Sequence, residues 1–379
     1  MTTRFTLVPV YGERFVGRKE ILGEMIKEAS DPRSNNGFCL HGRRRVGKTS
    51  ILKELEYELS KKEEIVIAHM SLYELADLSL KTFTEQLSAA VLKSFREKNV
   101  LPLEYTIDIL MKSPGEVVDS ALSKIKLGVD ISKELRYFLE FRKEKAENYT
   151  DAIKRAFDLG EKLAKASKIK FILILDEFPE ILKVEDGKQI VKMLRTLHEE
   201  HQHTTMIIAG SEKRTLEAVA LGSASPFYKQ LIPRKVTPFS FDETCEFLKK
   251  YGVKLSEEET KRLYEVTGGV PFYLQFIGRS MKTPKKIEDA IEEFIGEEGS
   301  VFFSEELEKL SEKEKVITIA IAKGAKTPTE IAESSGEPVT SVSSFLVGLQ
   351  EKDVVVKVEK ARYELVDGLF LFWLKRQYA

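Results

Sequence analysis

The chain has 379 residues, of which 42% are hydrophobic and 32% are charged, and its 60 Lys and Arg nearly balance its 61 Asp and Glu. This length predicts two or three domains, and a net charge of −1 excludes a polybasic protein that binds nucleic acid or anionic membranes through its overall charge. No apolar run approaches the roughly 20 residues of a membrane span. The N-terminus lacks a signal-peptide pattern, and Cys39 and Cys245 lack metal-ligand spacing. We therefore expect a cytoplasmic protein.

A glycine-rich loop follows the first predicted strand. An apolar segment at 37–42 runs into the loop, and apolar residues after it recur with helical spacing. In this strand–loop–helix context backbone N–H groups bind phosphate, Lys48 reaches the β- and γ-phosphates, and the Thr49 hydroxyl ligates Mg²⁺. The sequence therefore predicts a site for ATP or ADP and Mg²⁺ made by Gly42, Arg45, Val46, Gly47, Lys48, Thr49 and Ser50.

Further apolar runs predict a mostly parallel sheet covered by helices on both faces. Strands are expected at 64–72, 170–178 and 204–212, with an edge strand at 232–238 and a helical insertion at about 77–168. Residues 1–239 are therefore interpreted as the α/β core of a P-loop NTPase.

Two carboxylates end the apolar run at 170–178. Asp176 and Glu177 stand at the C-terminal end of a buried strand, where open α/β sheets bind their ligands. We expect Asp176 to hold Mg²⁺ and Glu177 to orient and deprotonate the attacking water. The alternative is that the pair merely ends the strand and caps a helix.

Ser211 ends the next predicted strand. Its hydroxyl either contacts the γ-phosphate or the lytic water, or it caps the following helix. The sequence there is not the Asn-Lys-x-Asp motif of GTPases, so ATP is favoured as the nucleotide. Arg214, Arg234 and Arg279 are candidates for an arginine finger, and the sequence does not rank them.

A short segment at 14–22 precedes the glycine-rich loop and allows two interpretations. In one, Phe15 and Val16 pack on adenine, Gly17 permits a close approach, and Arg18 fixes the turn. In the other, the segment is an ordinary turn before a helix.

Beyond residue 239 the pattern becomes helical. Serines followed three residues later by glutamate predict capping boxes at Ser240 and Ser256. Gly268 and Gly269 are expected to end one helix, and Pro271 to begin the next. We interpret residues 240–303 as a helical lid.

Residues 304–379 have the pattern of a winged helix. Helices are expected at about 305–323, 328–335 and 339–351, followed by two strands around a turn at 359–361 and a final helix. This part carries 11 Lys and Arg against 13 Asp and Glu, and the helix in the recognition position has no basic residue. DNA binders usually show a basic face, so a protein–protein or intramolecular role is at least as well supported as DNA binding.

Together these motifs resemble the archaeal ATPase family of the STAND class, a branch of AAA+-like P-loop ATPases related to archaeal origin-recognition initiators. The resemblance rests on FVGRKEI, LHGRRRVGKTSIL, FILILDEFPEI and GGVPFYL, which occur in that order, and it covers nearly the whole chain. It implies a five-stranded core, a lid and a winged helix. It also implies that Pro271 lies against the adenine, and that hydrolysis is slow with ADP often retained.

We therefore predict a Mg²⁺-dependent ATPase that acts as a nucleotide-controlled switch, in which ATP closes the lid and winged helix against the core. An ATP-licensed DNA-binding initiator or transcription regulator is the alternative, and a small-molecule P-loop kinase is less favoured. The sequence does not identify the signal, the protein partner or the oligomeric state.

Overall fold

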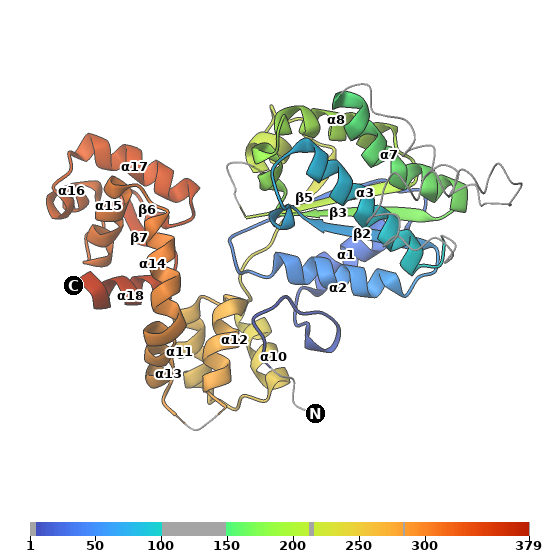
Figure 1. Cartoon of the computed structure of the whole chain (residues 1–379). Coiled ribbons are helices and arrows are strands. Elements are labelled where there is room, and N and C mark those ends of the chain that lie inside the picture. The colour runs from blue at the N-terminus through green and yellow to red at the C-terminus, as the bar shows by residue number, and fades with distance from the viewer. Residues whose placement is uncertain (1–4, 101–148, 212–215, 283–284, 379) are drawn as a thin grey trace, which may run out of the picture.

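The computed structural model describes residues 5–100, 149–211, 216–282 and 285–378, so most of the insertion expected at about 77–168 lies outside the described residues. Figure 1 shows three parts: an α/β core, a group of helices below it, and a small unit that carries the C-terminus. Among the described residues, no helix combines the length and the apolar character needed to cross a membrane.

The core is built on five parallel strands in the order β2-β3-β4-β1-β5, which confirms the predicted parallel sheet. The strand predicted at 232–238 lies at the edge of this sheet, as expected. The strands are β1 (Gly37–His41), β2 (Ile65–Ser71), β3 (Lys170–Asp176), β4 (Thr204–Gly210) and β5 (Leu231–Lys235).

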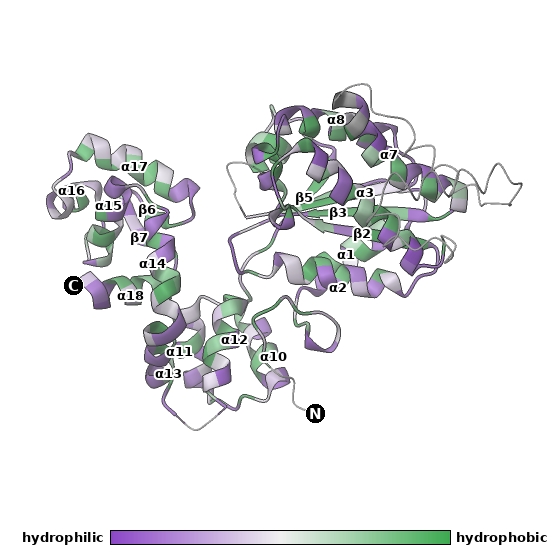
Figure 2. Ribbon diagram, viewed as in Figure 1, coloured by the Kyte–Doolittle hydropathy of each residue, from purple (hydrophilic) through white to green (hydrophobic). Residues whose placement is uncertain are grey.

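Alternate side chains of the buried strands enter two separate hydrophobic clusters, because successive strand residues face opposite sides of a sheet. Ile172 and Ile174 of β3 pack with α1 (Lys19–Ser30) and α2 (Lys48–Ser60). Leu173 and Leu175 pack on the other face with α3 (Leu80–Glu97), α7 (Tyr149–Ser167) and α8 (Gly187–Glu200). Figure 2 shows the hydrophobic sheet between these two helical layers.

The strands' carboxyl ends meet at one edge of the sheet. Ser71 of β2 pairs with Asp176 of β3, and His41 of β1 pairs with Gly210 of β4 and Lys235 of β5. Short 3-10 turns follow β2 at Leu72–Glu74 and β3 at Phe178–Lys183. Residues that follow these strands are therefore brought together whatever their separation along the chain.

The helices after the core begin and end as their capping residues predict. Ser240 and Ser256 form capping boxes with Glu243 and Glu259, and α12 begins at Pro271 after two glycines with positive φ. The helices of this part are α10 (Phe241–Tyr251), α11 (Glu257–Thr267), α12 (Pro271–Ser280) and α13 (Ile287–Phe294).

The C-terminal part has the element order expected for a winged helix, with one correction. The predicted helix at 305–323 is wrong: α14 (Ser300–Glu308) and α15 (Glu312–Ala322) are separate, because Ser311 forms a capping box with Glu314 and starts a new helix. The remaining elements are α16 (Pro328–Ser335), α17 (Val339–Glu351), β6 (Val355–Glu359), β7 (Arg362–Leu365) and α18 (Gly368–Tyr378).

The lid and C-terminal part are joined more closely than the division at residue 304 suggests. Residue 304 lies within α14, which continues from α13 through a π-helical turn at Ile295–Gly299. One hydrophobic cluster runs from Phe247 of α10 to Trp373 of α18. The helices beyond the core therefore share one core, and the three-part division stays a prediction.

Candidate functional site

The glycine-rich loop connects β1 to α2 through two glycine-dependent positions. A Cβ on Gly42 would collide with the carbonyl oxygen of Val236, and Gly47 has φ +96 at the N-cap of α2. Both positions suit glycine, the first by close approach and the second by its left-handed backbone. The loop is thereby curled over the N-terminus of α2, the end of a helix that favours anions.

Lys48, the first residue of α2, lies across the loop. Its side chain is buried, and its Nζ donates to the carbonyl oxygens of Gly42 at 3.0 Å and Arg43 at 2.9 Å. Burial lowers the pKa of Lys48, while the carboxylates of Glu177 and Asp176 act in the opposite direction. The predicted phosphate-binding lysine and the two predicted acids therefore belong to one electrostatic site.

Thr49 and Asp176 meet at the start of α2. The Thr49 hydroxyl donates to Asp176 Oδ2 at 2.7 Å, and the backbone N–H of Glu177 donates to Asp176 Oδ1 at 2.9 Å. Asp176 is only 3% exposed. A hydroxyl and a carboxylate are oxygen ligands that Mg²⁺ prefers, so the donor set fits the predicted metal.

Glu177 and Ser211 are brought together from neighbouring strands. Ser211 Oγ donates to Glu177 Oε2 over 3.4 Å, a long hydrogen bond. Burial raises the pKa of Glu177, whereas Lys48 and Arg44 oppose that rise. Glu177 also has φ +50, a left-handed conformation that costs a non-glycine residue on the order of 1 kcal/mol. A strained, half-buried carboxylate beside a lysine is the kind of group that a reaction uses as a base.

A family model described as an ATPase domain predominantly from Archaea matches residues 15–277, which is more than half of the chain. The chain belongs to this family of ATPases. It binds and hydrolyses ATP, as the sequence predicts. A search of curated protein sequences finds no match to this chain.

Solved structures share the fold of this ATPase. A Walker-type ATPase of Pyrococcus abyssi has a TM-score of 0.68 and 20% identity, and the match covers 98% of this chain and 99% of that one. The Aeropyrum pernix ORC2 protein, solved as ADPNP–ADP complexes, has a TM-score of 0.61 and 14% identity over 97% of this chain and 94% of that one. At these identities the likeness establishes the fold.

Arg18 contacts both the phosphate loop of the ATPase and α10, the first helix after the core. Its guanidinium donates to the carbonyl oxygens of Val46 at 3.1 Å and Thr237 at 2.5 Å, and it lies 4.8 Å from the ring centre of Phe239. Its backbone N–H donates to Glu243 on α10 at 2.8 Å. Burial lowers the pKa of Arg18. Arg18 therefore connects the phosphate loop to α10, in addition to holding the turn in which it lies.

Of the two residues predicted to pack on adenine, Val16 faces the helices after the core, whereas Phe15 packs against the cluster of α1 and α2. Val16 is 5% exposed and belongs to the hydrophobic cluster of the lid. Gly17 has φ +68, a left-handed backbone that favours glycine, and it lies against the Glu243 carboxylate. Contact of Val16, Gly17 and Arg18 with a nucleotide stays a prediction.

Three other predicted binding residues occupy structural positions around the loop. Val46 is buried beneath it, and Ser50 Oγ accepts a hydrogen bond from the backbone N–H of Val10 at 3.2 Å. Pro271 begins α12, next to Val270, which lines the cavity described below. The structure does not test their contacts with nucleotide.

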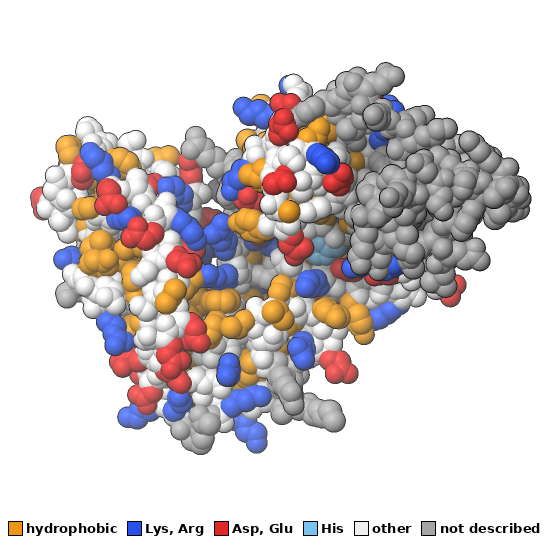
Figure 3. Space-filling view, viewed as in Figure 1, with side chains coloured by type: hydrophobic (Ala, Val, Ile, Leu, Met, Phe, Trp, Pro, Cys, Tyr) orange, Lys and Arg blue, Asp and Glu red, His pale blue; other side chains and the backbone are white. Residues whose placement is uncertain are grey.

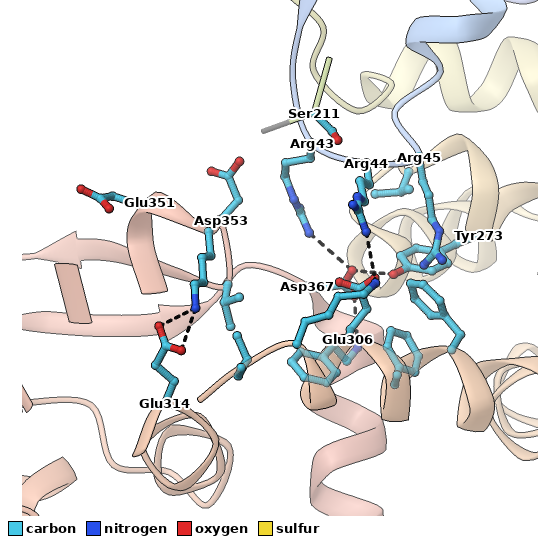
Figure 4. A pocket seen from close by; sticks show the side chains of 18 of the residues that line it. Arg43, Arg44, Arg45, Ser211, Tyr273, Glu306, Glu314, Glu351, Asp353 and Asp367 are labelled. Carbon is cyan, nitrogen blue, oxygen red and sulfur yellow. Dashed lines mark hydrogen bonds and ion pairs between the residues drawn. The ribbon is translucent and has the colours of Figure 1, made fainter. Parts of the chain in front are cut away.

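The arginines of the phosphate loop reach three different partners outside it. Arg43 Nη2 lies 3.4 Å from Asp367 Oδ2, at the start of α18. Arg44 Nη1 lies 4.0 Å from Glu306 Oε1 on α14, and its Nη2 donates to the Tyr73 hydroxyl at 3.0 Å. All three arginines point from the core toward the C-terminal helices (Figure 4).

Arg45 is enclosed by aromatic rings. Its guanidinium carbon lies 2.9 Å from the ring centre of Phe302 on α14 and 4.5 Å from that of Phe272 on α12. Burial lowers the pKa of this arginine, and nearby acidic groups oppose the effect. Arg45, predicted from sequence to bind nucleotide, therefore contacts the lid, and its role toward nucleotide stays a prediction.

A cavity of about 630 Å³ is lined by these arginines and by residues of the C-terminal part. Its walls carry the loop arginines and Ser211 on one side and Glu314, Glu351 and Asp353 on the other, over apolar residues of α14 and α18. Figure 3 shows Lys and Arg side chains gathered where the core faces the C-terminal unit. The loop therefore borders a space between the core and the C-terminal helices.

The proposed arginine-finger candidates are dispersed. Arg234 forms an ion pair with Glu24 of α1, and Arg279 is exposed in the last turn of α12. Arg214 lies outside the described residues. Among the described residues, neither Arg234 nor Arg279 contacts Lys48, Asp176 or Glu177.

The sequence analysis missed the partners of the loop arginines. Tyr73 had a usable signal, because it comes just after a predicted strand whose carboxyl end meets the site. No local sequence pattern relates Glu306 or Asp367 to residues 43 and 44, so the sequence carried no signal for these two partners.

Proposed function

We propose that this ATPase is a Mg²⁺-dependent, nucleotide-controlled switch of the STAND class, in which the loop arginines pass the state of the nucleotide to the lid and winged helix. The observation that supports it most directly is the Arg43–Asp367 contact, which joins the phosphate loop to a residue 324 positions away. The residue roles below belong to this proposal.

Hydrolysis uses residues at the carboxyl ends of β3 and β4 and at the start of α2. Thr49 and Asp176 hold Mg²⁺, which neutralises charge on the β- and γ-phosphates when bound. Lys48 binds the phosphates, and Glu177 accepts a proton from the attacking water. The water oxygen bonds to the γ-phosphorus, and the bond to the bridging oxygen breaks. ADP leaves with that electron pair, and Ser211 orients Glu177.

Arg43 connects this chemistry to α18. Its backbone carbonyl accepts from Lys48, while its guanidinium faces Asp367. Asp367 also accepts from the Tyr273 hydroxyl at 2.6 Å and from the backbone N–H groups of Leu369 at 3.0 Å and Phe370 at 3.1 Å. A phosphate bound by Lys48 would compete with Asp367 for the Arg43 side chain.

The energy available suits a switch with two populated states. A partly exposed ion pair contributes about 0–1 kcal/mol, and a desolvated cation–π contact contributes up to about 2 kcal/mol. Two ion pairs and the Arg45 stack together therefore amount to roughly 3 kcal/mol, or about a hundredfold change in population. Because a phosphate bound by Lys48 would compete with Asp367 for the Arg43 side chain, we propose that ATP loosens these contacts, the reverse of the direction expected from sequence.

The switch is tested by a distance between core and C-terminal part. Spin labels are placed at Lys192→Cys on α8 and Ser344→Cys on α17, both exposed, in a Cys245→Ser background. The distance should increase from the ADP state to a state with a non-hydrolysable ATP analogue and Mg²⁺. Labels at Lys192→Cys and Ser60→Cys, both in the core, should report no change. Identical α8–α17 distances in both states would contradict the switch.

ATP-licensed DNA binding is the second candidate, and the surface of α17 supports it weakly. The exposed residues of this helix include Val339, Thr340, Ser343, Ser344 and Val347, all uncharged. Such a face suits a protein partner better than phosphate. Retention on duplex DNA that falls with rising salt would favour the DNA-binding role, and absence of retention at low salt would remove it.

A further inference from the structure

We propose that Arg44 provides the cation beside the transferred phosphate within the same chain, and that Tyr73 and Glu306 hold it in two alternative positions, one productive and one idle. This inference rests on the proposed hydrolytic roles of Lys48 and Glu177. It adds two positioning residues, Tyr73 and Glu306, which the motifs do not include.

The sheet register brings Tyr73 to the reaction edge. Ser71, the last residue of β2, pairs with Asp176, so the turn that contains Tyr73 begins beside the residues that follow β3. The Tyr73 hydroxyl accepts from Arg44 Nη2 at 3.0 Å. Tyr73 thus holds Arg44 on the side of the loop where Glu177 lies.

Arg44 lies in the same loop as Lys48. Its hydrogen-bond partner Tyr73 follows β2, and Glu177 follows the adjacent strand β3. Charge develops on the phosphate oxygens during transfer, and a guanidinium directed there stabilises it. Arg234 and Arg279 lie in other surroundings, so Arg44 is better placed than either for this role.

Glu306 contacts the same guanidinium from α14, at the same time as Tyr73 contacts it from the core. Its Oε1 lies 4.0 Å from Arg44 Nη1 and 2.7 Å from Lys309 Nζ. Glu306 therefore keeps a cationic partner when Arg44 leaves, so the exchange leaves no isolated carboxylate. Arg44 has a 43% exposed side chain, which leaves it room to move.

Because Tyr73 and Glu306 hold Arg44 in the two alternative positions, substitutions of these residues should change the hydrolysis rate in opposite directions. Tyr73→Phe removes the acceptor on the core side and should lower the single-turnover rate of ATP hydrolysis several-fold, with little change in nucleotide affinity. Glu306→Gln removes the competing charge and should raise that rate about twofold to fivefold. Arg44→Ala should lower it about tenfold or more, since cations at this position contribute strongly to phosphoryl transfer.

The test is single-turnover hydrolysis of ATP by the full chain, so that slow ADP release cannot hide the chemical step. Tyr73→Phe and Glu306→Gln are each measured alone and combined with Arg44→Ala, in which both should have no further effect. Matched controls are Tyr228→Phe, another exposed tyrosine of the core, and Glu305→Gln, the exposed neighbour of Glu306. Both controls should retain the parent rate.

Several results would overturn the inference: rates that move in the same direction in Tyr73→Phe and Glu306→Gln, an unchanged rate in either, or effects that persist without Arg44. If Tyr73→Phe lowers the melting temperature strongly, Glu306→Gln and its combination with Arg44→Ala decide the question. Wild-type hydrolysis and the α8–α17 distance change are measured in parallel. If both are present, failure concerns Arg44 and its partners; if both are absent, the proposed function fails.

Discussion

The two halves of the phosphate loop differ in where their contacts go. The half at 47–50 is held within the core, through the N-cap of α2, the loop carbonyls and Asp176. The arginine half at 43–45 contacts Asp367, Glu306 and two phenylalanines beyond the core, and within the core it contacts Tyr73. In the proposed switch, one half binds phosphate and the other passes that state to the helices beyond the core.

This difference explains how one loop can serve both catalysis and signalling. Arg43 is involved in both, because its carbonyl accepts from Lys48 while its guanidinium faces α18. In the proposed switch, binding of phosphate at Lys48 is therefore linked to α18 through the single residue Arg43. The helices from α10 to α18 share one hydrophobic cluster, so they can respond together.

The largest expected effect concerns the core-bound half. Lys48→Ala should abolish ATP binding measured by calorimetry, because it removes the buried ammonium that binds phosphate. Glu177→Gln should bind ATP with near-wild-type affinity and lose turnover by about a hundredfold or more, the usual contribution of a general base. Equal ATP affinity in wild type and Lys48→Ala would show that this half of the loop is not the phosphate site.

An intermediate effect is expected from pH. Because burial raises the pKa of Glu177 above the usual 4.5 of a glutamate, this base should become protonated at a higher pH than an exposed glutamate. The single-turnover rate should then fall about tenfold per pH unit below the raised pKa. ATP affinity followed over the same range should change less than the rate.

The sign of the linked stability separates this loss from unfolding. A carboxyl group with a raised folded-state pKa binds its proton more tightly when folded, so its contribution to folding stability increases as pH falls. Acid should therefore slow hydrolysis without Glu177 destabilising the fold. A melting temperature that falls in step with the rate, and is restored by Glu177→Gln, would contradict this account.

The smallest effect concerns the arginine half. In a double-mutant cycle of Arg43→Gln and Asp367→Asn, the coupling energy should be about 0.5–1 kcal/mol and should decline with salt, because both side chains are partly exposed. Thermal or denaturant unfolding supplies the four stabilities. The cycle is needed because Asp367 also caps α18. Coupling indistinguishable from zero at low salt would remove Arg43 as a link between the halves.

Predictions from sequence succeeded where neighbouring residues determine the structure. The strand–loop–helix, the two carboxylates after β3, the capping boxes and the start of α12 at Pro271 all follow from local backbone preferences. The break between α14 and α15 was not predicted, although it too is determined by neighbouring residues. Ser311 and Glu314 have the spacing of a capping box.

The sequence alone determined that this chain has a phosphate loop with Asp176 and Glu177 at the edge of a parallel sheet. Its helix boundaries and turns depend on hydrogen bonds between residues a few positions apart, which a sequence displays directly. Only the tertiary structure decided what Arg43, Arg44 and Arg45 touch. Those contacts join residues as much as 324 positions apart, and their meeting depends on how the lid packs against the core as a whole.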